Sequence, residues 1–220
     1  MPRDRAAAKR AWRSYAGSGA FTRAFLFGRL AILPLGRIDD ALRNLSGSVL
    51  SIGSGHGILE RYLAEINPDV EIEGFELDDE RVRAAAATQE RAPRVRIRHA
   101  DVTDLTAEGI YDAAIAVDVM HHVASKDHPR VAQAVADRLR PGGTVLVKDM
   151  DVEPRWKWAW NRTHDRLVSG REPTYCRDPE TMATVFEAAG LRRIEIRRFH
   201  HRDPYPQYLV LLQKPALTDA

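Results

Sequence analysis

Three closely spaced glycines, Gly53, Gly55 and Gly57, follow the apolar run 49–52. A short apolar run that ends in glycines is typical of a central parallel strand. Glycine lets the backbone turn sharply and lets a ligand approach it without meeting a Cβ, and the unpaired amides that start the next helix then point at that ligand. Glycine turns also occur without a ligand, so the interpretation depends on the residues that come after the turn in the chain.

Acidic residues follow the glycine turn at informative distances. The run 70–77 is predicted to be a second strand, with Glu76 at its end. An acid about twenty residues past a glycine turn is where nucleotide-binding βαβ units hold a ribose diol, because two carboxylate oxygens can accept from two hydroxyls. A third predicted strand, 95–100, leads into Asp101 and Val102, where Asp101 is placed to accept from an adenine amino group.

Two classes of cofactor fit a glycine turn and a ribose acid. A dinucleotide site requires a small residue where Ile58 stands, and the run here is G-x-G-x-G instead. With His99–Val102, the strand 111–118 and the Arg140-Pro141-Gly142-Gly143 stretch, the chain from about Ser48 to Lys214 resembles the class I S-adenosylmethionine-dependent methyltransferases. The resemblance implies S-adenosyl-L-methionine as the cofactor, and these cofactor contacts: Ser51, Gly53, Ser54, Gly55, Glu76, Leu77, Asp101, Val102 and Asp118.

One position departs from the family pattern. Members often carry an acid two residues before the first glycine, where it helps to orient the amino-acid end of the cofactor, and here that residue is Ser51. Recognition of the amino-acid end of the cofactor is therefore less certain than recognition of the ribose.

Side chains that could act on a methyl acceptor follow the fourth and fifth predicted strands. Methyl transfer needs the nucleophile, the methyl carbon and the sulfur in line, and a protonated oxygen or carbon acceptor also needs a base. We predict His122, Asp149 and His164 as catalytic, because histidine titrates near neutral pH. Structural roles for His122 and Asp149 stay open. The same region, with His121 and Asp151, has the ligand types for a divalent ion, but no H-x-x-x-H pairing supports one, and no metal is expected.

Two segments are candidates for substrate recognition. The insertion at about 149–177 leaves the carboxyl end of a strand, where ligands bind in open α/β sheets. If it is helical, Trp156, Trp160 and His164 align on one face, with the tryptophans either contacting the substrate or packing against the domain. Residues 1–46 are predicted to be a helical lid, with Tyr15 near the substrate mouth; the alternative is a helix over 21–33 that contacts a membrane surface and admits a lipid-like substrate.

Alternating strand and helix patterns are expected to position these residues. Helices are predicted over 58–66, 79–91, 129–139 and 179–189, and later strands over 144–148, 193–199 and 208–214. The expected fold is α/β, a Rossmann-like sheet of seven mostly parallel strands with a terminal antiparallel hairpin and helices on both faces. A lid over 1–46 and a methyltransferase domain over 47–220 are expected.

Composition narrows the function further. The 220 residues carry a formal charge of +2, which does not favour nucleic acid, and a single cysteine, Cys176, which excludes an internal disulfide. No apolar run is long enough to span a bilayer, and we expect a cytoplasmic protein. The sequence carries no signal for an oligomeric state. The predicted function is methyl transfer to a small hydrophobic acceptor, aromatic or lipid-like and preferably on oxygen; the alternatives are an RNA methyltransferase and a non-catalytic cofactor-binding partner protein.

Overall fold

The computed structural model describes residues 4–104, 111–154, 174–199 and 206–216. The chain forms two compact units: Met1–Leu105 with Tyr111–Ala113, and Thr106–Ile110 with Ala114–Ala220. The strands are hydrogen-bonded in one sheet, in the order β3-β2-β1-β4-β5-β7-β6. This arrangement confirms the predicted Rossmann-like fold.

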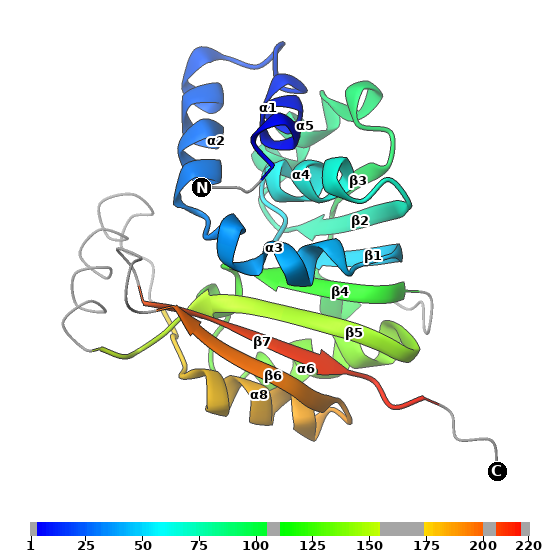
Figure 1. Cartoon of the computed structure of the whole chain (residues 1–220), viewed down its shortest axis with the longest axis vertical. Helices are drawn as coiled ribbons and strands as arrows, with labels where there is room; N and C mark the ends of the chain where they lie inside the picture. The colour runs from blue at the N-terminus through cyan, green and yellow to red at the C-terminus, as the bar shows by residue number, and fades with distance from the viewer. Residues whose placement is uncertain (1–3, 105–110, 155–173, 200–205, 217–220) are drawn as a thin grey trace. The chain divides into compact units, whose positions relative to one another are not determined.

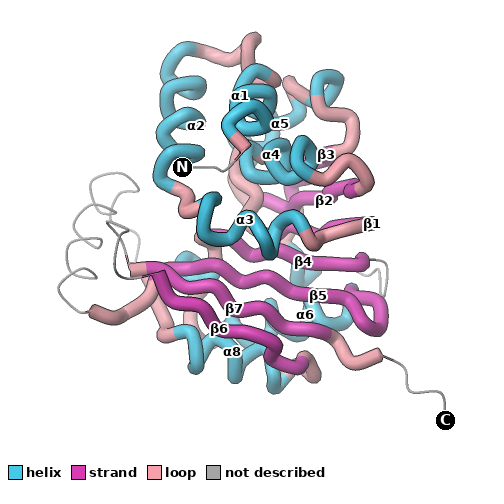
Figure 2. The backbone as a smooth tube through the Cα atoms, viewed as in Figure 1, coloured by secondary structure: helices cyan, strands magenta, loops and turns pink. Residues whose placement is uncertain are grey.

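Seven strands and seven α-helices are described, with three short 3-10 helices between them (Figure 2). The strands are β1 (Gly47–Ile52), β2 (Val70–Glu76), β3 (Val95–His99), β4 (Tyr111–Val117), β5 (Leu139–Met150), β6 (Arg192–Phe199) and β7 (Gln207–Gln213). The helices are α1 (Arg5–Arg13), α2 (Ala20–Ile32), α3 (Leu35–Arg43), α4 (Ile58–Ile66), α5 (Asp79–Ala86), α6 (His128–Arg138) and α8 (Pro179–Ala188), and the 3-10 helices are η1 (Gln89–Arg91), η2 (Val102–Asp104) and η3 (Met120–His122).

In the first unit, β1, β2 and β3 pair in parallel, which brings the carboxyl ends of β1 and β2 to one edge. The register places Ile52 opposite Phe75 and Glu76 opposite His99. Helix α1 lies against α4 (Figure 1), and Arg10 forms an ion pair with Glu65 on α4 at 2.5 Å. The N-terminal helices are therefore attached to the helix that follows the glycine turn.

In the second unit, β7 is antiparallel to both β5 and β6, as the predicted hairpin requires. Helix α8 packs on β6 and β7 and against α6. The side chain of Asp178 accepts from the Thr181 amide at 2.9 Å, so the expected cap starts α8.

Two element boundaries differ from the prediction by more than two residues. Helix α5 ends at Ala86, and within the remainder of the predicted helix Gln89–Arg91 form η1. Strand β5 starts at Leu139, five residues before the predicted start, because the Gly142 amide donates to Lys214 and the Lys214 amide donates to Gly143. Local periodicity does not reveal that a distant strand extends this pairing.

Candidate functional site

The glycine turn lies in the first unit, between β1 and α4. Gly53, Gly55 and Gly57 have φ values of 64°, 56° and 76°, in the left-handed region that favours glycine. The amides of Gly53 and Ser54 both donate to the Phe75 carbonyl, at 2.8 and 3.2 Å. A Cβ on Gly55 would meet no atom within 4 Å, so the backbone there is open to a ligand.

Glu76, the predicted ribose acid, is buried at the end of β2 and closes the turn. Its Oε2 accepts from the Gly55 amide at 2.7 Å, and its Oε1 accepts from the Leu77 and Asp78 amides, both at 2.9 Å. The carboxylate therefore links the glycine turn to the end of the neighbouring strand. Each carboxylate oxygen can accept about two hydrogen bonds, so these three contacts leave capacity for a ribose hydroxyl.

The residues predicted to hold the adenine lie beside Glu76. The Ala100 amide donates to the Glu76 carbonyl at 3.3 Å, which places the end of β3 next to the end of β2. Asp101 starts η2, and its Oδ1 accepts from the amide and the hydroxyl of Thr103, both at 2.8 Å. Leu77 is 65% exposed, whereas Val102 is buried. An exposed leucine next to the ribose acid offers an apolar surface to a planar ring.

Tyr15 is fully buried, and its hydroxyl donates to the backbone carbonyl of His56 inside the glycine turn. Beneath it, the Arg61 guanidinium lies 4.9 Å from the Tyr15 ring centroid and donates to the carbonyls of Gly57 at 3.0 Å and Ala85 at 2.9 Å. Burial lowers the pKa of Arg61. The predicted substrate contact of Tyr15 stays a prediction, and the hydrogen bond observed here supports the turn.

Ser51, at the position where the resemblance leads us to expect an acid, is buried and hydrogen-bonded to a glutamate. Its hydroxyl donates to Oε1 of Glu60 at 2.6 Å. Glu60 is 2% exposed, and its Oε2 has no hydrogen-bond partner. Burial raises the pKa of Glu60, while the Ser51 hydrogen bond opposes that rise. A carboxylate therefore lies beside Ser51 although the sequence has none at that position.

Asp118, predicted to contact the cofactor, follows β4 in the second unit. It has a φ of 55°, unusual for a residue with a side chain. Its amide donates to the Lys148 carbonyl at 2.9 Å, and its Oδ1 accepts from the Lys148 ammonium at 2.5 Å. Lys148 is fully buried in β5. This ion pair fixes the Asp118 carboxylate at the ends of two strands.

The predicted catalytic residues His122 and Asp149 lie in the same unit, joined through His121. The Asp149 carboxylate accepts from the backbone amide of His121 at 3.0 Å and contacts its Nδ1 at 2.5 Å, and it also accepts from the Met150 amide at 2.7 Å. The His121 and His122 rings lie 4.1 Å apart between centroids. Asp149 and His121 are buried, whereas His122 is exposed. Asp149 thus positions the histidine pair.

The remaining predicted contacts, Trp156, Trp160 and His164, lie outside the described residues. Within the described ranges, no group of three or more His, Cys, Asp and Glu side chains is arranged to hold a metal ion. In the same ranges, no helix has the length and apolarity needed to cross a membrane.

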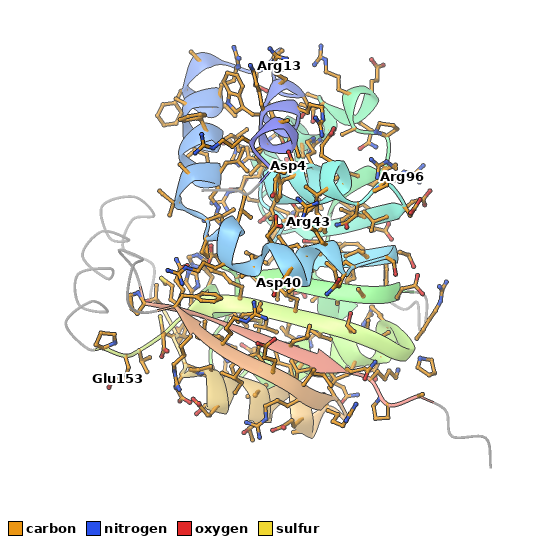
Figure 3. All side chains as sticks on the ribbon, in the orientation of Figure 1. Asp4, Arg13, Asp40, Arg43, Arg96 and Glu153 are labelled. Atoms are coloured by element: carbon orange, nitrogen blue, oxygen red, sulfur yellow. The ribbon has the colours of Figure 1, made fainter. Side chains whose placement is uncertain are left out.

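A surface hollow of about 740 Å³ lies away from the glycine turn, at the start of α1 and along α3. Its lining residues include Asp4, Asp40 and Arg43, which are labelled in Figure 3. Arg43 forms an ion pair with Asp39 at 2.7 Å and faces Asp4 at 3.8 Å. The lining of this hollow includes the paired charges of Arg43, Asp39 and Asp4, and it includes none of the predicted site residues.

Comparison with known proteins identifies the class to which this fold and turn belong. Residues 23–196 match the family described as a methyltransferase domain, so the chain belongs to this methyltransferase family. The match confirms the predicted methyltransferase class. The predicted contacts of S-adenosylmethionine in this unit include the open backbone at Gly55, the carboxylate of Glu76 and the exposed Leu77.

Particular relatives share parts of the chain. The chain is 30% identical over 126 residues to a ubiquinone biosynthesis O-methyltransferase of Nitrosospira multiformis, covering 56% of this chain and 51% of that protein. A protein of the same name from Bordetella avium is 30% identical over 122 residues, covering 54% and 49%. The chain thus spans about half the length of these relatives. A SAM-dependent methyltransferase from Archaeoglobus fulgidus shares the fold, with a TM-score of 0.68, 13% identity, and coverage of 84% and 94%.

Three residues that contact the predicted site residues were not themselves predicted from the sequence: Glu60, Arg61 and Lys148. All three are charged and buried. Charged residues are almost never fully buried unless paired. In the sequence, Glu60 and Arg61 occupy adjacent positions in an amphipathic helix, where charged residues are usually solvent-exposed. The sequence offers one signal for Glu60: the absence of an acid at Ser51 indicates that a carboxylate from another position could take its place.

Proposed function

We propose that this enzyme transfers the methyl group of S-adenosylmethionine to an oxygen atom of a small hydrophobic acceptor, aromatic or lipid-like. The observation that carries the proposal is the His121–Asp149 pair beside the exposed His122. A hydroxyl acceptor needs a base, and an imidazole can take its proton near neutral pH. The names of the Nitrosospira and Bordetella relatives support oxygen as the acceptor atom.

His122 is the proposed base, because its exposed ring can meet a substrate. Asp149 acts through His121 as a positioning residue: its two oxygens hold the backbone amide and the ring of His121, against which the His122 ring lies. The cofactor supplies the electrophilic methyl group when bound. The protein must align the acceptor oxygen with that group and remove its proton.

The preference for a hydrophobic acceptor is supported by α2. Phe21, Phe25 and Ile32 are 86%, 44% and 53% exposed. With Gly28 they occur at spacings of four, three and four residues, so they form one stripe of the helix. The Phe25 ring lies 5.6 Å from the His56 ring of the glycine turn. An apolar stripe that reaches this turn suits an apolar acceptor, and it would also serve peripheral contact with a membrane surface.

The test is methyl transfer from labelled S-adenosylmethionine to a series of phenols with increasing alkyl length, alongside the matching anilines. We expect methylated phenols, with kcat/KM rising with chain length and little transfer to the anilines. His122→Asn should lower kcat by about 10²-fold or more, the usual contribution of a general base, without changing the Kd for S-adenosylhomocysteine. Transfer to anilines alone, or a His122→Asn enzyme with wild-type kcat, would overturn the proposal.

A further inference from the structure

We propose that Glu60 binds the α-ammonium group of S-adenosylmethionine, replacing the strand acid that related methyltransferases carry where this chain has Ser51. The proposal rests on the methyltransferase function given above. In this assignment, a residue in the first turn of α4 recognises the amino-acid end of the cofactor. The family pattern places that role at the end of β1.

The first argument is the position of the carboxylate. Ser51 is two residues before Gly53, and its hydroxyl donates to Oε1 of Glu60 at 2.6 Å. Glu60 is the third residue of α4, directly after the glycine turn. The serine therefore connects the expected position of the acid to the position at which a carboxylate is found. Together, Ser51 and Glu60 provide a hydroxyl and a carboxylate at the place where a single acidic residue is expected.

The second argument is the unpaired oxygen. Glu60 is only 2% exposed, and its Oε2 has no hydrogen-bond partner. Within the described ranges, none of the ion pairs found involves this carboxylate, although the charges of Arg61 and Arg29 act on it. Buried polar atoms in proteins are nearly always hydrogen-bonded, and a buried charge is paired or is costly. A carboxylate that served the fold alone would have both oxygens satisfied, whereas a ligand that carries a cation would satisfy the second oxygen when it binds.

The third argument concerns the neighbouring Arg61, which is engaged elsewhere. Arg61 is next in sequence, yet its guanidinium donates to the carbonyls of Gly57 and Ala85 and to the Thr88 hydroxyl, and it lies on the Tyr15 ring. These contacts hold it beneath the glycine turn. The Arg61 guanidinium therefore does not bond to Oε2 of Glu60, and this oxygen stays available to a cationic ligand beside the glycine turn.

The chemistry of the ligand distinguishes this role from general support of the turn. S-adenosylmethionine and S-adenosylhomocysteine both carry the α-ammonium, whereas 5′-methylthioadenosine has the same adenosine and thioether without the amino-acid end. A residue that binds the ammonium affects only the first two compounds. A residue that merely shapes the turn affects all three.

Calorimetric titration of wild type and Glu60→Gln with S-adenosylhomocysteine and 5′-methylthioadenosine tests the assignment. Glutamine has nearly the same shape and no charge, so the turn should persist. We expect the Kd for S-adenosylhomocysteine to rise at least tenfold and that for 5′-methylthioadenosine to change less than threefold. Glu65→Gln, the same change on the outer side of α4 where Glu65 pairs with Arg10, is the matched control and should change neither.

A second pair of variants tests the exchange of positions. Glu60→Ser should bind S-adenosylhomocysteine weakly, and Ser51→Asp combined with Glu60→Ser should bring the Kd back to within about threefold of wild type. The assignment is overturned if Glu60→Gln binds S-adenosylhomocysteine like wild type, or if it weakens both ligands equally. If the wild-type protein binds neither compound, the proposed function itself is wrong. This outcome differs from failure of the Glu60 assignment, because it appears in the wild-type protein before any variant is compared.

Discussion

Removal of the Glu76 carboxylate tests the link between the glycine turn and cofactor binding. In Glu76→Ala, the amides of Gly55, Leu77 and Asp78 lose the oxygens that accept from them at 2.7–2.9 Å. Each hydrogen bond to a charged acceptor contributes about 1.5–3 kcal/mol, part of which water restores at an exposed amide. Leu77 is exposed, so the expected loss is about 2–4 kcal/mol rather than the full sum of the three bonds.

The loss should be visible both in stability and in binding. At about 2–4 °C per kcal/mol for a chain of this length, Tm should fall by about 4–16 °C. The prediction that Glu76 accepts from the ribose hydroxyls also requires the Kd for S-adenosylhomocysteine to rise tenfold or more. Differential scanning fluorimetry gives the first value, and calorimetry well below the Tm of the variant gives the second.

The matched control is Glu71→Gln, on the exposed side of the same strand. It should leave both Tm and Kd within error of wild type. If Glu76→Ala shows unchanged Tm, the hydrogen bonds of its carboxylate do not hold the turn. If it shows unchanged Kd, the placement of the ribose at Glu76 is wrong.

Two further predictions concern packing and pH. Gly74→Ala should destabilise the protein by about 1–3 kcal/mol in urea denaturation, because the new Cβ would lie 2.2 Å from Oγ of Ser54. The control Gly28→Ala, where nothing lies within 4 Å of the new Cβ, should leave the free energy of unfolding unchanged or raise it. A Gly28→Ala protein less stable than Gly74→Ala would contradict the packing argument. Burial lowers the pKa of His128 below the usual 6.5, and Arg177 donates to its Nδ1, so the folded state prefers the neutral ring. This contribution to stability is complete above about pH 6.5 and is lost as the pH falls through the lower folded pKa. Tm should therefore decline from pH 6.5 to 5, less steeply in His128→Gln, and an equal slope in the two proteins would refute the role of His128.

Local sequence determined the elements that surround the site. Helix α4 begins at Ile58 and ends at Ile66, as predicted, because the glycines before it and the apolar periodicity within it are both short-range signals. The start of α8 follows from Asp178 and Pro179 for the same reason. The cofactor class is predicted from the G-x-G-x-G run and Glu76 together with the segments 99–102, 111–118 and 140–143, whose order and spacing are properties of the sequence.

The tertiary structure alone decided which side chains meet. Tyr15 is 41 residues from His56, and its hydroxyl bond to the turn depends on how the N-terminal helices pack. Asp149 and His121 are 28 residues apart and meet because Asp149 lies at the end of β5 and His121 follows the neighbouring strand β4.

Ser51 illustrates the difference best. In the sequence it is a missing acid, because a strand position by itself does not reveal what packs against it. In the structure, the buried carboxylate of Glu60 lies within hydrogen-bond distance of its hydroxyl. Periodicity places Glu60 on a helix, but the helix face that packs against the strand is set by the fold. The sequence by itself therefore determined the elements and the predicted class of cofactor, and the contact between Glu60 on α4 and Ser51 on β1, which only the fold creates, decided where the carboxylate lies.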